Sequence, residues 1–467
     1  MGKIDVLVEV ESTVDDAFEH FSAALDSEVE SLELGESLLA DLSGYGLEVQ
    51  GDLPPVPMFS TQIGESAEVG FSDFASPEEN ADQTSQTFVV ACEIERSSIE
   101  ELNNREGVRV WPNSTLALFP TCTSCGGSIT ADSSEVHPFD AAPSSGGIDC
   151  RPFRPAVTIE TIRTLLGVER IWFDGFKGQN IVVGIIDEGV NGEVYPVTGG
   201  FTRPNTPLPG GADIESHGSM CAADVLVAAP AAKLYDYPFI GVPKSGGALA
   251  MFQEVLDQRR RDGTPHITSN SYGFYGRPSK VTFPNHEVWD INHPIHRKVQ
   301  EVIASGCPVF FAAGNCGGEC PSTKCHSSGI GPGISIHASA SLKDVITVAA
   351  VNSKHQRIGY SSQGPGGFEQ QKPDVSAYSH FFGNFGPGRP AGGDATVFDN
   401  GTSASTPVAA GIGALLMSAF PTMSPDRLKK ALIKGAINIG PAGWDANTGW
   451  GVVNAAASYI HLRNNDI

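Results

Sequence analysis

The chain has 467 residues, of which 40% are hydrophobic, and this composition fits a soluble α/β protein with two or three domains. No run approaches the roughly 18 consecutive apolar residues that a membrane span needs, so a membrane partner is not expected. Of the 54 Asp and Glu residues, 29 lie in residues 1–150, against 4 of the 30 Lys and Arg residues. The N-terminal third therefore carries the net charge of −24, and nucleic acid is not an expected partner either.

The first residues, MGKIDVLVEVESTVDD, contain no long apolar segment of the kind found in secretory signals. We therefore expect either a cytoplasmic location or export by a route that the sequence does not reveal. The chain has nine cysteines. Because nine is an odd number and no secretory signal is predicted, reduced thiols are the default expectation.

Residues 1–119 show the pattern of a small folded domain. Alternating apolar residues predict a strand over 4–10, and helical spacing follows over 13–25. A second strand over 86–94, a short helix and a strand over 108–119 then complete the pattern. This succession predicts a small α+β domain of the ferredoxin-like type.

Two segments of low periodicity separate the predicted elements. Residues 50–85 are rich in Pro, Ser, Gly and acids, and predict a long mobile loop inside the first domain. Residues 120–157 are rich in Ser, Gly and Pro and predict a linker. From 158 to 467, continuously apolar strands alternate with helices, which is typical of a doubly wound, mostly parallel α/β sheet.

Four segments of the second domain carry the residue types that serine hydrolysis requires. In chain order, the candidate residues of these four segments are Asp187, His217, Asn315 and Ser403. An acid and an amide follow two predicted strands, whereas the histidine and the serine each open a predicted helix of small residues. Taken singly, each has an ordinary structural interpretation as a cap, a turn residue or a buried histidine.

The combination resembles the subtilisin-like (subtilase) family. Its motifs are matched in order by Asp-Glu-Gly at 187–189, His-Gly-Ser at 217–219, Ala-Gly-Asn at 313–315 and Gly-Thr-Ser-Ala-Ser-Thr-Pro at 401–407. The resemblance covers about 158 to 460. It implies a subtilisin-like fold and a serine endopeptidase in which Ser403 is the nucleophile, His217 its base and Asp187 the group that orients the histidine. Asn315, together with the Ser403 N–H, would then bind the oxyanion.

The same resemblance implies the partners. Ser271, Tyr272 and Gly273 are expected to bind a protein or peptide substrate in extended conformation by strand pairing. Residues 1–119 resemble a propeptide that inhibits the enzyme within the same chain, with cleavage expected in 117–157. No cofactor is required for this chemistry. Members often bind structural calcium, although no Asp/Asn-rich loop in this sequence marks a calcium site.

Two positions near the predicted catalytic residues set this sequence apart. Glu188 stands where the family usually has a small hydroxyl residue. Cys221 resembles the free cysteine that lies beneath the catalytic histidine in the thiol-containing branch of the family, and its other interpretation is a small buried apolar residue. If the thiol lies there, an organomercurial should inhibit.

The remaining cysteines leave several interpretations open. Cys316, Cys320 and Cys325 follow the predicted oxyanion donor and fit a disulfide with one free thiol, reduced cysteines or, less well, a zinc site. Cys122 and Cys125, with Cys150 nearby, are equally open. The function itself has two alternatives: a maturation protease dedicated to one cellular substrate, and a peptide-binding pseudoprotease.

Overall fold

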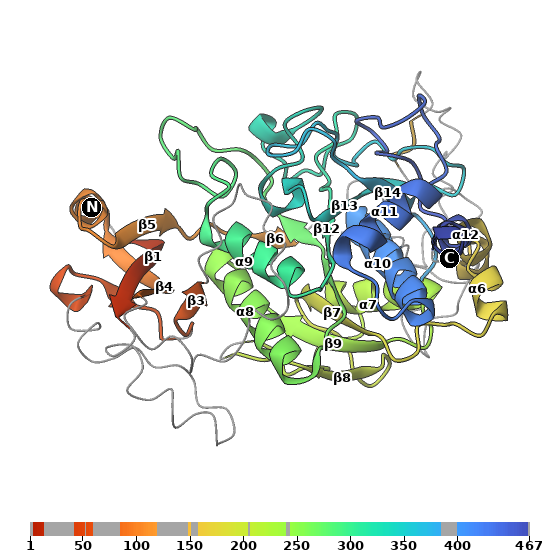
Figure 1. The fold of residues 1–467 in the computed structure, drawn as a ribbon. Coiled ribbons are helices and arrows are strands. Elements are labelled where there is room, and N and C mark those ends of the chain that lie inside the picture. Colours follow the sequence, from red (N-terminus) through yellow and green to blue (C-terminus); the bar gives the residue numbers. More distant parts are fainter. Residues whose placement is uncertain are drawn as a thin grey trace, which may run out of the picture.

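An antiparallel sheet forms the N-terminal domain of the computed structural model (Figure 1). Its strands follow the order β2-β4-β1-β5, with β3 also paired to β4, which is the order expected of a ferredoxin-like sandwich. The strands are β1 (Lys3–Thr13), β2 (Glu48–Val49), β3 (Val56–Met58), β4 (Ser85–Glu95) and β5 (Val108–Pro112). A 3₁₀ turn at Arg96–Ser98 and helix α4 (Ile99–Asn103) connect β4 to β5. The predicted α+β domain is therefore confirmed.

The structure describes residues 3–13, 42–51, 53–58, 85–118, 148–150, 157–203, 206–239, 243–383 and 399–465. The helix predicted over 13–25 lies outside these residues from position 14 onward. Part of the predicted loop over 50–85 is a strand, since β3 pairs with β4 through Val56 and Val89. Pro55 and Pro57, both buried, conceal the strand in the sequence, because proline is rare in sheets.

Strand β1 explains how the N-terminal domain attaches to the rest of the chain. Val6, Val8 and Val10 pack into the core of the domain itself. Leu7 faces the other way and shares an apolar cluster with Leu249 of helix α8 (Ser245–Asp262). Because strand residues alternate between faces, one strand supplies both cores.

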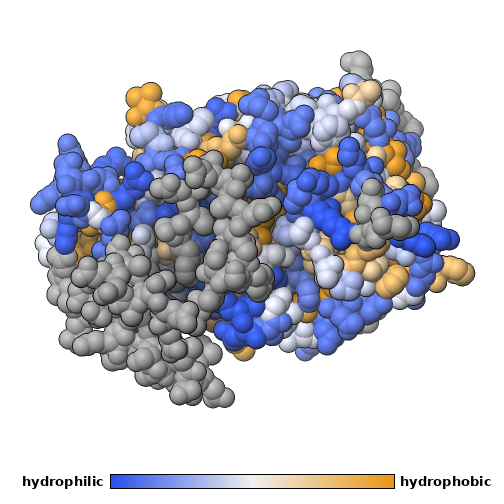
Figure 2. Space-filling view, viewed as in Figure 1, coloured by the Kyte–Doolittle hydropathy of each residue, from blue (hydrophilic) through white to orange (hydrophobic). Residues whose placement is uncertain are grey.

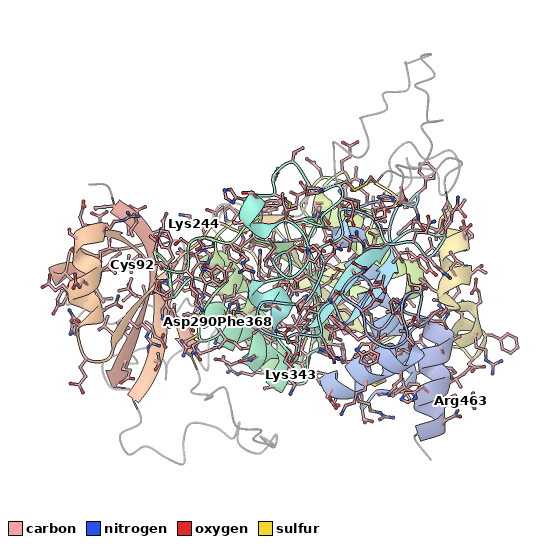
Figure 3. All side chains as sticks on the ribbon, turned by 90° about the horizontal axis from the view of Figure 1, so that it is seen from above. Cys92, Lys244, Asp290, Lys343, Phe368 and Arg463 are labelled. Atoms are coloured by element: carbon pink, nitrogen blue, oxygen red, sulfur yellow. A yellow bond between two sulfur atoms is a disulfide. The ribbon has the colours of Figure 1, made fainter. Side chains whose placement is uncertain are left out.

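Charged side chains surround this apolar contact. Lys244 forms an ion pair with Asp5 at 2.6 Å, and Arg297 forms one with Glu9 at 2.6 Å. Figure 3 labels Lys244 at the junction between the two domains and Cys92 inside the N-terminal sheet. The part of the N-terminal domain that Figure 2 shows is mostly hydrophilic, in keeping with the acidic composition of this region.

The second domain is built on a seven-stranded sheet in which every neighbouring pair is parallel. The strand order is β14-β13-β12-β10-β7-β9-β8. In chain order the strands are β7 (Val182–Asp187), β8 (Val197–Gly200), β9 (Lys233–Pro238), β10 (Ile267–Asn270), β12 (Val309–Ala312), β13 (Ile346–Val351) and β14 (Val375–Tyr378). This confirms the predicted α/β class.

Helices cover both faces of this sheet (Figure 1). One face packs on α7 (His217–Ala228) and α10 (Thr402–Ala419), and the other on α8 and α9 (Pro294–Ala304). The remaining helices are α5 (Ile159–Leu166), α6 (Glu169–Phe173), α11 (Pro425–Gly435) and α12 (Ala455–Asn465), with 3₁₀ turns at Ser327–Gly329 and Ala338–Ser341. Among the described residues, none of the helices has the length and apolar character that crossing a membrane requires.

The chain reverses its direction across the sheet between β7 and β10. From β7 it proceeds outward on one side to β8 and β9, and β10 and β12 then lie on the other side. Ligands of open α/β sheets bind at the carboxyl ends of the strands beside such a reversal. Asp187 ends β7, Ser271 follows β10 and Asn315 follows β12, so this edge gathers three of the predicted site residues.

Candidate active site

Asp187 and His217 form a buried hydrogen-bonded pair. Oδ1 of Asp187 lies 2.8 Å from Nδ1 of His217, and their side chains are 1% and 8% exposed. The aspartate ends strand β7, and the histidine is the first residue of helix α7. A carboxylate at Nδ1 fixes the imidazole in the tautomer whose Nε2 can accept a proton. The pair therefore has the arrangement of a general base and its orienting acid.

Two features of the local chain hold His217 in place. Its backbone N–H donates a hydrogen bond to Oε1 of Glu188, the residue in which this sequence departs from the family pattern. The next residue, Gly218, lies against the loop after β7, because a Cβ there would come within 2.3 Å of the carbonyl oxygen of Gly189. Glu188 thus supplements the N-cap Ser216 by accepting a hydrogen bond from the first N–H of the helix that carries the histidine, a contact that the sequence did not predict.

Ser403 lies in the first turn of α10, with its residue fully buried. Gly401 precedes this helix with φ +80°, a conformation that side-chain-bearing residues rarely adopt. The carbonyl oxygen of Ser403 accepts hydrogen bonds from the Oγ of Ser271 at 3.3 Å and from the Sγ of Cys221 at 3.5 Å. The same Sγ lies 3.9 Å from Nδ1 of His217, so one thiol contacts both the Ser403 backbone and the His217 ring.

The side-chain amide of Asn315 has its oxygen held by hydrogen bonds and its nitrogen available as a donor. Its Oδ1 accepts hydrogen bonds from the backbone N–H of Thr402 at 2.9 Å and from Oγ1 of Thr402 at 3.0 Å. This pattern identifies the oxygen, so the nitrogen must point the other way. Nδ2 is buried and has no hydrogen-bond partner among the described residues. An unsatisfied buried donor beside the residue before Ser403 is what an oxyanion site requires.

Cys221 lies beneath the histidine, as the family resemblance implies. Its Sγ is 3.7 Å from Oδ2 of Asp187. Burial, together with the carboxylates of Asp187 and Asp224, raises the pKa of the Cys221 thiol well above its ordinary value. Among the described residues, Asp187, His217 and Cys221 are the one group whose ligand atoms lie close enough to hold a metal ion, all within 4.8 Å of one another.

The predicted substrate strand is paired with the chain's own N-terminal region. Strand β11 (Tyr272–Gly273) pairs antiparallel with β6 (Ala117–Leu118). On the opposite side of this segment, the N–H of Leu116 donates to the carbonyl oxygen of Pro243 at 2.8 Å. Residues 115–118 thus lie between two stretches of catalytic-domain backbone, which is the position that an extended peptide would take.

A small cavity of about 20 Å³ adjoins this segment. Leu116 lines it together with Tyr272, Phe311, Ala313 and residues 337–340. Burial lowers the pKa of His337, one of the lining residues, to about 4. The wall around the Leu116 side chain is therefore largely apolar and uncharged near neutral pH.

The cysteines behind Asn315 are not reduced. Cys316 is joined to Cys325, and Cys320 is joined to Cys150, which lies 170 positions earlier in the chain. The default expectation of reduced thiols is therefore wrong for these four residues. The second disulfide could not be predicted from spacing, because its partners meet only in the folded chain. Cys122 and Cys125 lie outside the described residues.

A buried polar cluster that the sequence did not predict lies beside the tail of the N-terminal domain. Glu287 accepts hydrogen bonds from the N–H of Ser114 at 3.1 Å and from its Oγ at 2.8 Å. Nε2 of His293 lies 3.0 Å from the carbonyl oxygen of Pro112, and Nε2 of His286 lies 3.0 Å from the Ser114 hydroxyl. No motif marks these residues, because their partners belong to a different domain.

Comparison with known proteins agrees with this geometry. The sequence profile of the subtilase family matches residues 178–451. Subtilisin DY of Bacillus licheniformis is 28% identical over 304 residues, which span 63% of this chain and 96% of that protein. A calcium-dependent protease of Trichormus variabilis is 27% identical over 353 residues, and the match spans 63% of this chain but only 48% of that protein.

A solved structure is also similar. The crystal structure of fervidolysin from Fervidobacterium pennivorans, a keratinolytic enzyme related to subtilisin, aligns with a TM-score of 0.58 at 17% identity. The alignment covers 98% of this chain and 61% of that chain. At this identity the likeness shows the fold alone, whereas the family profile covers more than half of the present sequence. The chain therefore belongs to the subtilase family and is a subtilisin-type serine endopeptidase.

Proposed function

We propose that Ser403 attacks the scissile carbonyl, with His217 as general base and Asp187 as its orienting acid. The observation that carries this assignment is the 2.8 Å contact between Asp187 and His217. The thiol of Cys221 contacts both the His217 ring and the backbone carbonyl of Ser403, so the pair lies close to the proposed nucleophile. His217 accepts the hydroxyl proton and later gives it to the leaving amine. The acyl group is then bound to Ser403, and water hydrolyses this acyl-enzyme: His217 accepts a proton from the attacking water and gives it to the departing Ser403 oxygen.

The oxyanion of the tetrahedral intermediate would bind to Nδ2 of Asn315 and to the N–H of Ser403. Support for the first donor is its lack of any other partner and the fixed orientation of its amide. Support for the second is the position of Ser403 in the first turn of α10, because the N-terminal end of a helix favours negative charge.

Substrates would bind as an extended strand between β11 and the backbone at Pro243. Residues 115–118 already make these contacts, with the Tyr275 hydroxyl donating to the carbonyl oxygen of Leu118 at 2.6 Å. Main-chain pairing of this kind accepts any extended sequence, and the side-chain pockets then select. Ser271, Tyr272 and Gly273 are the residues of this chain that we assign to it.

Residues 1–119 would act as an inhibitory propeptide within the same chain. Their tail lies where substrate is proposed to bind, and polar contacts to Glu287 and His293 fix its direction. Opposite charges support the docking, since basic residues of the catalytic domain face acidic residues of the N-terminal sheet. Cleavage after this segment, in 117–157, would convert a self-inhibited zymogen into the active enzyme.

Two alternative functions differ from this proposal, one in its substrates and the other in its chemistry. A dedicated maturation protease would cleave one cellular protein and leave casein intact, whereas a general endopeptidase would degrade both. A pseudoprotease would bind peptides without cutting them, but the described site keeps every side chain that the chemistry uses. Of the two predicted locations, export is favoured by the two disulfides, because such bonds persist in oxidising compartments.

The test compares the wild-type chain with Ser403→Ala in casein hydrolysis and in cleavage of the chain itself. We expect the wild type to cut casein and to release a fragment that ends in 117–157, and the variant to do neither. If purified Ser403→Ala is still clipped at the same bond, self-processing is wrong.

The predicted structural calcium is tested by adding and chelating calcium in the same casein assay. We assign no calcium site among the described residues.

A further inference from the structure

Residues 148–150 lie against the catalytic sheet, although the sequence places them in the linker. Asp149 forms a parallel bridge with Ile358, and its carbonyl oxygen accepts a hydrogen bond from the N–H of Gly359 at 2.7 Å. The next residue, Cys150, is bonded to Cys320 in the loop after Asn315. This short segment is therefore attached to the catalytic domain by both backbone pairing and a covalent link.

The side chain of Asp149 begins a buried chain of hydrogen bonds. Its Oδ2 lies 3.4 Å from Nδ1 of His380, and Nε2 of His380 lies 3.0 Å from the hydroxyl of Tyr360. The tyrosine hydroxyl in turn accepts a hydrogen bond from the backbone N–H of Gly401 at 2.8 Å. His380 and Tyr360 are fully enclosed, with 3% and 0% of their surface exposed.

The Tyr360 hydroxyl can donate its proton either to Nε2 of His380 or to Oγ of Ser379, which lies 3.2 Å away, and the first arrangement also supplies the proton that the Asp149 carboxylate accepts. The N–H of Gly401 leaves the tyrosine oxygen free to donate its own proton to Nε2 of His380. The imidazole must then carry its proton on Nδ1, where the carboxylate of Asp149 accepts it. The Asp149 carboxylate therefore favours the His380 tautomer with its proton on Nδ1. In this tautomer Nε2 accepts the proton of the Tyr360 hydroxyl, and a lone pair of the same hydroxyl faces the N–H of Gly401.

Gly401 is the residue at which this network reaches the nucleophile. Its carbonyl oxygen accepts a hydrogen bond from the Ser379 hydroxyl at 3.0 Å, so both polar groups of the residue are fixed. Its φ of +80° directs the chain into α10, and Ser403 follows two positions later. His380 itself has φ +62°, an unfavourable backbone conformation for a residue with a side chain, and such strain is often found at functional positions.

We propose that Asp149 is a positioning residue for the nucleophile, acting through His380 and Tyr360 on the peptide of Gly401. This inference rests on the proposed role of Ser403. It implies that the active catalytic unit includes residues 148–150, so the cut that releases the N-terminal domain lies before Ile148. The linker thus contains a segment that belongs to the mature enzyme.

The experiment is a double-mutant cycle on the full chain, with kcat measured per active site titrated by a fluorophosphonate. Tyr360→Phe removes the acceptor for Gly401 and should lower kcat about 10-fold with KM unchanged, because only the placement of the nucleophile is disturbed. Asp149→Ala should lower kcat in the same direction, and Asp149→Asn should restore most of it, since its amide oxygen still accepts the Nδ1 proton. The double variant should equal Tyr360→Phe.

Tyr378→Phe is the matched control. The Tyr378 hydroxyl lies 2.6 Å from Nε2 of the half-buried His355 and forms a second tyrosine–histidine pair. Gly401 bonds to Tyr360 and Ser379 instead, so Tyr378→Phe should leave kcat unchanged. Losses from Asp149→Ala and Tyr360→Phe that multiply would overturn the proposal, as would an Asp149→Ala enzyme with wild-type kcat per titrated site. A mature chain that starts after Cys150 and keeps full activity would also overturn it. Absence of Ser403 labelling in the wild type would instead refute the proposed function on which it rests.

Discussion

The side-chain oxygen of Asn315 is held by the backbone N–H of Thr402 at 2.9 Å, which leaves the side-chain nitrogen as an unpaired donor among the described residues. The residue that fixes this amide is the immediate neighbour of Ser403. The oxyanion donor and the nucleophile are therefore positioned by one short contact rather than by separate parts of the fold.

This contact predicts the effect of removing the donor. Asn315→Ala should lower kcat by about 100-fold to 1000-fold, because the oxyanion loses a hydrogen bond that forms only in the transition state. KM for a peptide ester should change little. Steady-state kinetics per titrated site measure both values, and wild-type turnover in this variant would show that Asn315 is not the donor.

The thiol beneath the histidine predicts inhibition by soft metals. An organomercurial should bind Sγ of Cys221 and displace the imidazole, whose Nδ1 is 3.9 Å away. Because burial raises the pKa of this thiol, the reaction should be slower than that of an exposed cysteine. Cys221→Ala should remain active and lose its sensitivity to the reagent. Full activity of the wild type after the thiol is titrated would contradict this prediction.

Glu188 predicts a stability effect that is separate from catalysis. Its carboxylate accepts the hydrogen bond of the His217 N–H at the start of α7. Glu188→Ala should lower the free energy of unfolding by about 1 kcal/mol, which is typical for the loss of one intramolecular hydrogen bond. Glu188→Gln keeps an acceptor and should lose less. Denaturant unfolding of both variants in the Ser403→Ala background, where self-cleavage is prevented, compares the two values directly.

The histidines at the domain junction predict that acid weakens docking of the N-terminal domain. Burial lowers the pKa of His286 and of His293 below the ordinary value of about 6.5, despite the attraction of the nearby Glu287 carboxylate. Once the domain leaves, Trp111, Pro112 and Ser114 no longer contact these rings, so we expect the rings to become more exposed and their pKa to rise toward that value. Below about pH 6.5 the released form therefore binds protons that the docked form does not, and the balance shifts toward release.

Size-exclusion chromatography of the processed chain at pH 5 and pH 8 measures this shift. The N-terminal fragment should remain with the catalytic domain at pH 8 and separate increasingly at pH 5. His286→Gln retains a hydrogen-bonding side chain without a titratable ring and should reduce the dependence. Docking that is equally tight at both pH values would contradict the prediction.

Much of the fold could be predicted because its signals are local. Continuous apolar runs such as 182–186 indicate buried parallel strands, and the alternation in 4–10 indicates a strand with two different faces. The motifs also identified the candidate site residues Asp187, His217, Asn315 and Ser403, because each follows or opens a predicted element. Their catalytic roles stay predictions until turnover is measured.

What sequence reasoning missed depends on contacts between distant segments. Cys150 and Cys320 give no signal of pairing until β12 and β13 bring residues 316–320 beside residues 358–360. Asp149 looks like any linker acid, and only the fold places it next to His380. Strand β3 was likewise hidden, because it contains Pro57 and its pairing with β4 forms only in the folded sheet.

The most direct test of the central claim is labelling of the purified chain with a fluorophosphonate, beside Ser403→Ala, followed by mass mapping of the labelled peptide and of any cut. The account predicts label on Ser403 of a chain whose N-terminal fragment has been cut off before Ile148, and no label on the variant. A wild-type chain that takes up no label, even after residues 1–119 have been removed, would contradict it.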